Sequence, residues 1–520
     1  MPAATRYIVR TALIVALGGF LMGFDASVIS GVVSFIKPEF ALTQIELGWS
    51  VASLTLTATL AMMLSGPLSD RLGRRPMLQL AAMLFALSAL LSALTPNFAT
   101  LVAARLIGGL GVGAALIIAP LYIAEIAPAR LRGRLVSFNQ LNIVLGISAA
   151  YFSNYLILRL GHSTLSWAHA LGMGHWNWRW MLGIEALPSM IYFLALLSVP
   201  ESPRWLAMRG RDAEARAILS RACGAEQADA ELLALQQSLT GDAGREHASI
   251  RELWQPAMKR VLTIGVAMAI VQQITGINAV FFYAPTIFEQ SGIGADASFM
   301  QAALVSLVNL IFTLVAIALI DRLGRRPLLA LGLAGIAVCM LSLAYGFGTA
   351  RYSIRSGTVA SLPQQIDRTN LQPLIDRSFD SDVSFRKAVI GAVGAQVYQE
   401  HQSAFLSAAI TINPALVLLG VLGFVASFAV SLGPVMWVLF SELFPNRIHG
   451  IAISFVGLIN SAVSFGVQLV FPWELEKLGN SGTFLLYGLF AIVGLFVVMK
   501  LLPETKGRSL EELELVLVRR

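Results

Sequence analysis

The sequence contains little charge and almost no cysteine. Asp, Glu, Lys and Arg make up 13% of its 520 residues, whereas about 25% is usual for a soluble protein. Hydrophobic residues make up 56% and the mean hydropathy is +0.72, so the chain could not cover a water-facing surface. This balance excludes an ordinary soluble enzyme, a disordered chain and a nucleic-acid-binding protein. The 2 cysteines exclude a disulfide scaffold. The net charge of +7 fits a membrane protein with basic cytoplasmic loops.

Long apolar runs fill most of the chain, and a transmembrane helix needs about 20 largely apolar residues. Six such runs lie near 9–32, 47–68, 77–95, 98–122, 135–158 and 180–199. Six more lie near 261–288, 298–320, 327–348, 412–440, 450–471 and 483–502. We therefore predict an all-α membrane protein with twelve transmembrane helices in two pseudo-symmetric six-helix halves. The predicted domains are an N-terminal bundle over 1–200, a cytoplasmic helical linker over 201–258, and a C-terminal bundle over 259–520.

The short loops indicate the orientation. The links between helices 2 and 3, 4 and 5, and 8 and 9 each contain several arginines, whereas the links between helices 3 and 4 and helices 7 and 8 contain no Lys or Arg. The basic side of a membrane protein is normally cytoplasmic, so we predict that both termini are cytoplasmic. The segment 349–409 then forms an external loop, and we expect an amphipathic helix near 384–400.

Three motifs occur twice in the same order. The repeated pairs are Asp70-Arg-Leu-Gly-Arg-Arg-Pro76 with Asp321-Arg-Leu-Gly-Arg-Arg-Pro327, Ala124-Glu125-Ile-Ala-Pro128 with Ser441-Glu442-Leu-Phe-Pro445, and Pro200-Glu201-Ser202 with Pro503-Glu504-Thr505. They indicate a duplicated six-helix unit. These charges either only anchor the cytoplasmic helix ends, or also form a network that holds one face shut during alternating access.

Three charged residues lie well inside predicted membrane helices, away from their ends: Asp25, Arg105 and Glu185. Each buried charge costs roughly 3 kcal/mol on insertion scales, so each needs a reason. An Asp–Arg pair would neutralise both charges, and protonation of the aspartate would release the arginine. The pair is either a proton-coupling site or a static ion pair. Glu185 is explained equally well by coupling or by hydrogen bonds to backbone.

Neutral amides gather on predicted helix 7. The residues are Gln272, Gln273 and Asn278, with Asn309 and Asn460 on later helices. Amides both donate and accept hydrogen bonds, which suits a ligand made of hydroxyl groups in a central cavity. The alternative is that they only join helices. Gly276 and Pro285 would allow helix 7 to bend or break.

The motifs together resemble those of the sugar porter family of the major facilitator superfamily, over nearly the whole chain. The resemblance rests on the repeated strings and on Arg105 with its glycine run, Pro120-Leu-Tyr-Ile-Ala-Glu-Ile-Ala-Pro128, Pro200-Glu-Ser-Pro-Arg-Trp-Leu206, Gln272 to Asn278, Gly433-Pro434 with Trp437, and Pro503-Glu-Thr-Lys-Gly507. The closest likeness is to the bacterial xylose/proton symporters, most clearly in Leu135-Val-Ser-Phe-Asn-Gln140.

The resemblance implies the major facilitator fold, a cytoplasmic (inner) membrane location and roles for particular residues. Proton coupling would fall on Asp25 and Arg105, with Glu185 as a further candidate. Sugar binding would fall on Gln272, Gln273, Asn278, Asn309, Trp437 and Asn460. The cytoplasmic gate charges would be Arg75, Glu125, Arg132, Glu201, Arg326 and Glu442.

Some positions depart from the family pattern: Ile147, Phe282, Leu432 and His449. They leave fewer hydrogen-bond partners on one side of the site and keep the identity of the sugar open. The long loop also occurs in some proton-linked myo-inositol carriers, so a cyclic polyol remains possible as the substrate.

We predict a monomeric carrier that imports a pentose or hexose with a proton, without cofactor, metal or nucleic acid. The alternatives are a proton-linked polyol or myo-inositol symporter, a passive sugar facilitator, a sugar sensor and a membrane enzyme. Sensors carry long cytoplasmic tails, whereas only about 17 residues follow Pro503, so we expect a transporter. The sequence contains no metal cluster, phosphate loop or nucleophile motif that would indicate an enzyme.

Overall fold

The computed structural model describes residues 3–243, 250–359, 362–363, 366–444 and 448–506, apart from some side chains within these ranges. The chain divides into two compact units, which are described separately. Unit 1 comprises Met1–Val28, Ser53–Ala150 and Arg179–His247, and unit 2 comprises Ile29–Ala52, Tyr151–Trp178 and Ala248–Arg520. This division follows contacts in space. The three predicted domains along the sequence remain a prediction.

Eleven helical segments among the described residues are long and apolar enough to cross a membrane. The sixth predicted run, near 180–199, is broken into α8 (Asn177–Gly183) and α9 (Ala186–Leu196). Pro188 lies in the first turn of α9 and has no N–H with which to continue a helix from α8. Glu185 stands at the N-cap of α9. The predicted all-α membrane protein is confirmed.

Unit 1 is built from long helices around a core of small and aromatic side chains. Its membrane helices are α1 (Ala3–Val28), α4 (Arg74–Leu94), α5 (Phe98–Ile126), α9, and the larger parts of α3 (Gln44–Leu72) and α6 (Ala129–Gly161). The core joins α1, α4 and α5 through residues such as Ala12, Phe85 and Ile118. The segment after α9 forms α10 (Pro203–Met208), α11 (Asp212–Cys223) and α12 (Ala225–Ala243), which confirms the predicted helices in the described part of 201–258.

Unit 2 contains most of the remaining membrane helices and several short ones. The long helices are α13 (Lys259–Ile274), α16 (Ala295–Leu323), α17 (Arg325–Gly348), α21 (Pro414–Val430), α22 (Leu432–Leu443), α23 (His449–Lys477) and α24 (Gly479–Leu501). The short helices outside the long loop are η1 (Ile29–Gly31), α2 (Val33–Glu39), α7 (Ser166–Ala170), η2 (Ile250–Trp254), η3 (Pro256–Met258), α14 (Ile277–Phe282) and α15 (Ala284–Glu289).

Predicted helix 7 is divided into three segments, α13, α14 and α15. Gly276 ends the first segment in the left-handed conformation, with φ of 87°. A Cβ atom there would lie 2.6 Å from the ring of Tyr487. Pro285 begins the third segment, where a missing N–H costs nothing. The predicted bend at Gly276 and Pro285 is confirmed.

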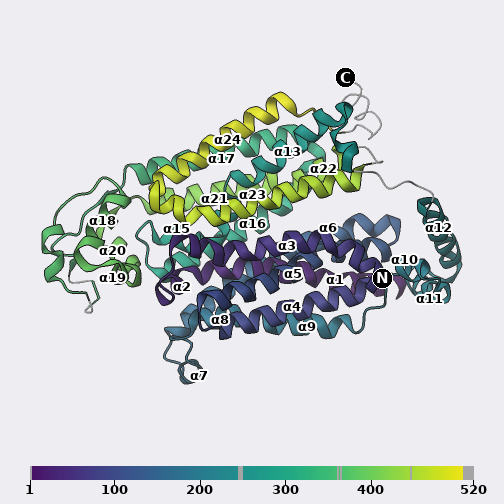
Figure 1. Ribbon diagram of the computed structural model, residues 1–520, viewed down its shortest axis with the longest axis horizontal. Coiled ribbons are helices and arrows are strands. Elements are labelled where there is room, and N and C mark those ends of the chain that lie inside the picture. Colours follow the sequence, from purple (N-terminus) through teal and green to yellow (C-terminus); the bar gives the residue numbers. More distant parts are fainter. Residues whose placement is uncertain (1–2, 244–249, 360–361, 364–365, 445–447, 507–520) are drawn as a thin grey trace. The chain divides into compact units, whose positions relative to one another are not determined.

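The long loop folds into a small body with its own core. It contains β1 (Arg351–Tyr352), η5 (Thr369–Leu374), α18 (Asp382–Val393), α19 (Ala395–Glu400), α20 (Gln402–Ala409) and β2 (Ile410–Thr411), with β1 and β2 antiparallel. We call the described residues of 349–413 the loop body. Its core includes Tyr352, Phe385 and Phe405. Figure 1 shows α18, α19 and α20 grouped together at one end of α17, α21 and α24. The helix expected near 384–400 is two helices, α18 and α19.

Candidate functional site

The three ionisable residues predicted inside the membrane meet in unit 1. Arg105 of α5 donates through Nη1 to Asp25 Oδ1 of α1 and, at 3.1 Å, to the Asp25 carbonyl oxygen. Both side chains are about 1% exposed, and Glu185 is 2% exposed. Glu185 interacts electrostatically with both members of the pair. The site therefore holds two carboxyl groups and one guanidinium away from water.

Several polar atoms of this site have no hydrogen-bond partner among the described residues. They are Asp25 Oδ2, Glu185 Oε1, and Nε and Nη2 of Arg105. An unsatisfied buried polar atom costs about 1–3 kcal/mol. A rearrangement or a bound proton that gives these atoms hydrogen-bond partners would therefore lower the free energy of the site. A proton on one carboxyl group would turn an acceptor into a donor and reduce the net negative charge.

Gly108 makes room for the aspartate. A Cβ atom on this residue of α5 would lie 2.7 Å from Asp25 Oδ2 and 2.5 Å from Ser88 Oγ of α4. Both distances are shorter than real side chains allow, so the glycine run after Arg105 lets the carboxyl group approach α5 closely.

Four of the predicted sugar-binding amides form a connected cluster in unit 2. Asn460 of α23 donates through Nδ2 to Gln272 Oε1 at 2.7 Å, and accepts at Oδ1 from Gln273 Nε2 at 3.0 Å. Asn278 donates to Gln273 Oε1 at 2.9 Å. Gln272 donates to the carbonyl oxygen of Leu432 at 2.8 Å. These amides are buried or half-buried, and they now satisfy one another.

The cluster continues along α23 through residues that the sequence analysis missed. Asn278 donates to Ser464 Oγ at 2.7 Å, and Gln468 Nε2 donates to the same oxygen at 2.8 Å. The hydroxyl of Tyr283 donates to the carbonyl oxygen of Gln468 at 3.4 Å. The sequence signal for these residues is the i, i+4, i+8 spacing of Asn460, Ser464 and Gln468, which places three polar side chains on one face of an apolar helix. We call this chain of hydrogen bonds, from Gln272 to Tyr283, the amide ladder.

Two other predicted sugar-binding residues do not join the amide ladder. Asn309 of α16 is 7% exposed, and its side chain makes no hydrogen bond with another described residue. Trp437 of α22 is 49% exposed, and its ring packs edge-on against Phe440 with centroids 5.9 Å apart. Their predicted role in binding remains a prediction.

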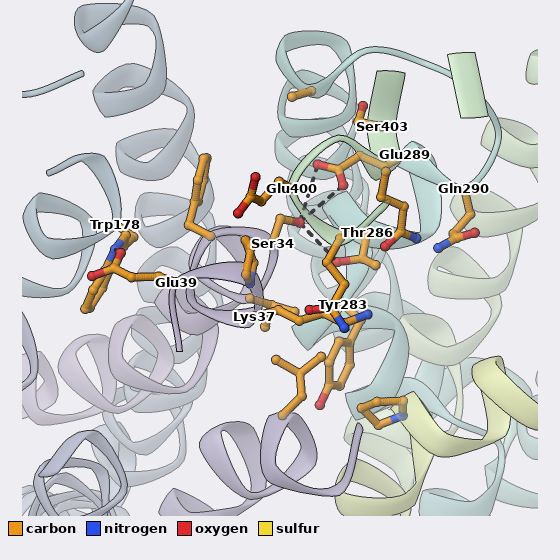
Figure 2. A pocket seen from close by; sticks show the side chains of 18 of the residues that line it. Ser34, Lys37, Glu39, Trp178, Tyr283, Thr286, Glu289, Gln290, Glu400 and Ser403 are labelled. Carbon is orange, nitrogen blue, oxygen red and sulfur yellow. Dashed lines mark hydrogen bonds between the residues drawn. The ribbon is translucent and has the colours of Figure 1, made fainter. Parts of the chain in front are cut away.

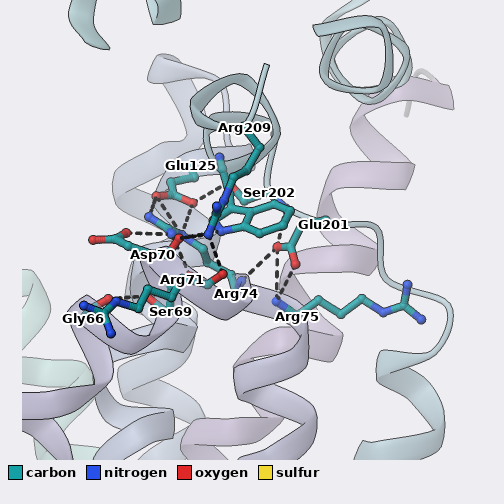
Figure 3. Close-up of polar contacts among 11 residues, drawn as sticks. Gly66, Ser69, Asp70, Arg71, Arg74, Arg75, Glu125, Glu201, Ser202 and Arg209 are labelled. Atoms are coloured by element: carbon teal, nitrogen blue, oxygen red, sulfur yellow. Dashed lines mark hydrogen bonds and ion pairs between the residues drawn. The ribbon is translucent and has the colours of Figure 1, made fainter. Parts of the chain in front are cut away.

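The three repeated motifs meet in a single cluster in unit 1. Arg74, at the start of α4, donates to Glu125 of α5 through Nε at 3.1 Å and Nη2 at 3.0 Å. The hydroxyl of Ser202 donates to Glu125 Oε2, the oxygen that also accepts from Arg74 Nε. The Glu201 carboxylate accepts the backbone N–H groups of Arg74 and Arg75 at 3.0 and 3.2 Å, as Figure 3 shows. A carboxylate at a helix N-terminus is stabilised by the unpaired N–H groups and the helix dipole.

The same cluster is repeated in unit 2. Arg325 donates to Glu442 at 2.7 Å, and the hydroxyl of Thr505 donates to the same carboxylate at 2.7 Å. Glu504 accepts the backbone N–H groups of Arg325 and Arg326 at 3.0 and 3.1 Å. Each motif of the sequence repeat thus supplies one part of the same cluster.

The structure assigns the ion pairs to the first arginine of each Arg-Arg string. Arg74 and Arg325 contact the glutamates, whereas the predicted gate residues Arg75 and Arg326 donate to the backbone carbonyls of Leu197 and Met499. The side chain of Arg132, another predicted gate residue, lies outside the part of the chain that the structure describes.

Comparisons with known proteins agree with this architecture. The family model described as "Sugar (and other) transporter" matches residues 11–361 and 387–517. The arabinose-proton symporter of Bacillus subtilis is 34% identical over 98% of this chain and 94% of its own length. The D-xylose-proton symporter of Escherichia coli K12 is 34% identical over 98% of this chain and 96% of its own.

A solved structure is similar over the same length. The inward open conformation of the xylose transporter from E. coli has a TM-score of 0.73 and 31% identity, and the match covers 98% of this chain and 100% of that one. The predicted transporter class, as opposed to an enzyme, is confirmed. The chain belongs to the sugar transporter family of the major facilitator superfamily.

Proposed function

We propose that this protein imports a monosaccharide together with a proton across the cytoplasmic membrane by alternating access, as a monomer with both termini cytoplasmic. The observation that carries the proposal is the buried group of Asp25, Arg105 and Glu185. A static ion pair needs only one carboxyl group for one guanidinium. The second carboxyl group leaves the site one negative charge in excess when both are ionised, and a bound proton would remove that excess.

The proton would act by changing the hydrogen bonds of Arg105. With Asp25 ionised, the guanidinium is held between α5 and α1. Protonation of Asp25 weakens that attraction, so the two helices can separate at lower cost. A proton and a sugar that both favour the rearranged state would be transported together.

The sugar would bind to the amides of Gln272, Gln273, Asn278 and Asn460. These groups now use their donors and acceptors on one another. A sugar hydroxyl both donates and accepts, so it can replace an amide–amide bond without leaving a buried group unsatisfied. The names of the relatives, arabinose-proton and D-xylose-proton symporters, favour a sugar as the ligand.

The repeated charge clusters would serve as the cytoplasmic gate. Each joins the ends of several helices in one unit, through Glu125 in unit 1 and Glu442 in unit 2. Alternating access requires such contacts to form in one state and break in another.

The driving force can be estimated from the stoichiometry of one proton per sugar. One charge crossing 100 mV contributes about 2.3 kcal/mol, and one pH unit contributes about 1.4 kcal/mol. The sum of about 3.7 kcal/mol supports an accumulation of several hundred-fold. A passive facilitator would support none, so the two alternatives differ by a large and measurable factor.

The test is uptake of labelled xylose, arabinose, glucose and myo-inositol into proteoliposomes, with and without an inward proton gradient. We expect concentrative uptake that collapses with a protonophore. Asp25→Asn should abolish accumulation of the sugar against its gradient. Movement of the sugar down its own gradient should remain. Glu231→Gln, on the exposed surface of α12, is the matched control and should behave as wild type. Accumulation that persists in Asp25→Asn would refute the coupling role. Uptake that only equilibrates would identify a facilitator, and preference for myo-inositol would identify a polyol carrier.

A further inference from the structure

Unit 2 contains a cavity of about 500 Å³ that lies apart from the amide cluster. Its walls are formed by α2, α15, the end of α23, the segment before α8, and the loop body. Figure 2 shows Glu289, Thr286 and Tyr283 facing Ser34 and Lys37, with Glu400 nearby. The charge rule predicts that the side of the loop body is external, so this cavity would face the outside of the cell.

The loop body is a fixed wall of this cavity. Asp382 accepts from the backbone N–H of Asn480 at 3.1 Å and from its side chain at 3.0 Å. Arg386 donates to the carbonyl oxygen of Glu476 at 2.5 Å. These contacts dock α18 onto the ends of α23 and α24, and the apolar core of the loop body holds α19 and α20 in place. The wall residues Glu400 and Ser403 are therefore presented by an ordered structure.

The cavity wall offers both hydrogen-bond acceptors and an ammonium group. Glu289 accepts from the hydroxyl of Ser34 at 3.2 Å and has further acceptor capacity. Glu39 accepts from Trp178 Nε1 at 2.5 Å. Lys37 makes no hydrogen bond or ion pair with another described residue, although it lines the cavity. Lys37 is attracted by Glu476 and repelled by Arg386, which line the same cavity. A ligand hydroxyl group could bridge this ammonium group and a wall carboxylate.

The chemistry of this wall fits a neutral polyhydroxylated ligand. A hydroxyl group can accept from an ammonium and donate to a carboxylate at the same time. The largely buried rings of Trp178 and Tyr283 also line this wall. The wall carries four glutamates against one lysine and one arginine, so anionic ligands are disfavoured. The volume lies within the range of about 300–1,000 Å³ that is typical of small-molecule sites.

The cavity is connected to the amide cluster by the amide ladder. Tyr283 forms the end of the ladder and lines the cavity, and its hydroxyl donates to the carbonyl oxygen of Gln468. Tyr283 also stands at the break between α14 and α15. If α14 and α15 move relative to each other at this break, a ligand could pass from the cavity to Asn278. The polar groups of the amide ladder would line its path.

We propose that this cavity is an external binding site for a neutral sugar or polyol, in which the ligand waits before it enters the central site. The inference rests on the proposed function for the class of ligand. In this proposal the loop body has a role in ligand binding, because α19 and α20 form one wall of the site. Tyr283 divides the two sites and is a positioning residue.

Binding can be separated from transport with the purified full-length chain in nanodiscs. D-Xylose, L-arabinose, D-glucose and myo-inositol are titrated while tryptophan fluorescence is recorded, and Trp178→Phe identifies the part of the signal that comes from the cavity. Asn278→Ala disables the central cluster. We expect this variant to lose uptake but to keep a saturable signal that depends on Trp178. Loss of that signal in Asn278→Ala, or its absence in wild type, would overturn the proposal.

Transport kinetics supply a second, independent test. Lys37→Met and Glu400→Gln should each raise KM roughly threefold to tenfold, the effect of one lost hydrogen bond, with Vmax unchanged. Lys387→Met, on the exposed side of α18, is the matched control for Lys37→Met. An unchanged KM in both cavity variants would refute the site. Glucuronate that binds as tightly as glucose would refute the assignment to a neutral ligand.

The two proposals can fail separately. If wild-type vesicles accumulate no sugar but the Trp178 signal saturates, symport fails and the external site stands. If uptake is concentrative but no Trp178 signal occurs, symport stands and the external site fails.

Discussion

The buried charge cluster of unit 1 should contribute more to stability than its repeat in unit 2. The side chains of Arg74 and Glu125 are 4% and 5% exposed, and two nitrogens of Arg74 contact the carboxylate. Glu125→Gln keeps the shape of the side chain but removes its charge. Among the described residues, Asp70, which is half-exposed, is then the one carboxylate that still forms an ion pair with the buried guanidinium. Breaking a buried pair costs about 3–5 kcal/mol. Because Asp70 remains, we expect a loss near 3 kcal/mol.

The corresponding change in unit 2 is Glu442→Gln. The side chains of Arg325 and Glu442 are 12% and 23% exposed, so water screens the pair and hydrates whichever partner is left. We expect a loss of about 1 kcal/mol, close to the value for partly exposed pairs. The two substitutions are chemically identical and occupy equivalent positions in the repeat. The difference between their losses of unfolding free energy therefore reports the effect of burial.

Thermal unfolding of the purified variants in one detergent is the assay. Tm should fall in both variants and should fall further in Glu125→Gln. The double variant Arg74→Met with Glu125→Met should recover part of the loss, because replacing both partners leaves no buried charge unpaired. An equal or larger fall in Tm for Glu442→Gln would refute the reasoning from burial. So would a double variant less stable than Glu125→Gln.

Further substitutions test other parts of the structure. Gly108→Ala should lower stability by about 1–3 kcal/mol, as for an overpacked core, and should also impair proton-driven accumulation; unfolding and uptake measurements on one preparation check both. Gly73→Ala should destabilise because φ is 106° and the new Cβ would lie 2.4 Å from Glu201 Oε2; Gly66→Ala, with nothing within 4 Å, is the control and should leave Tm unchanged or higher. Burial raises the pKa of Glu289 from 4.5 to about 7. Protonation of Glu289 therefore stabilises the folded state most below pH 4.5, and that stability is lost as pH rises through about 7. Glu289→Gln should flatten this dependence of Tm on pH, and equal slopes in both proteins would contradict the assignment.

The sequence predicted the membrane helices well because hydropathy over 20 residues is a local property. It did not predict the break before α9. Pro188 was visible, but a proline inside an apolar run is compatible with either a kink or two separate helices. The amide cluster was predicted because neutral amides are costly in an apolar helix. Its extension through Ser464 and Gln468 was missed, although their spacing from Asn460 places all three on one face of α23.

Contacts between segments far apart in the sequence were harder to predict. Two adjacent arginines differ by about 100° around a helix, so the sequence alone could not decide whether Arg74 or Arg75 faces Glu125. The decision depends on where α4 begins, and Gly73 sets that point by capping the helix. The core of the loop body could not be predicted from the sequence, because it joins short segments through residues with no regular spacing.

The charge cluster and the external cavity of unit 2 should respond to substitution independently. The cluster lies at the N-terminus of α17, around Arg325, whereas the loop body follows the C-terminus of the same helix. A helix of 24 residues is about 36 Å long. Effects of substitutions more than about 10 Å apart, without shared partners, usually add. The loop body can therefore give the second half an external wall without disturbing the charge cluster that both halves share. Combined variants of Glu400 and Glu442 should accordingly show additive changes in KM and Tm, and strong coupling between them would mean that α17 does not separate the two sites.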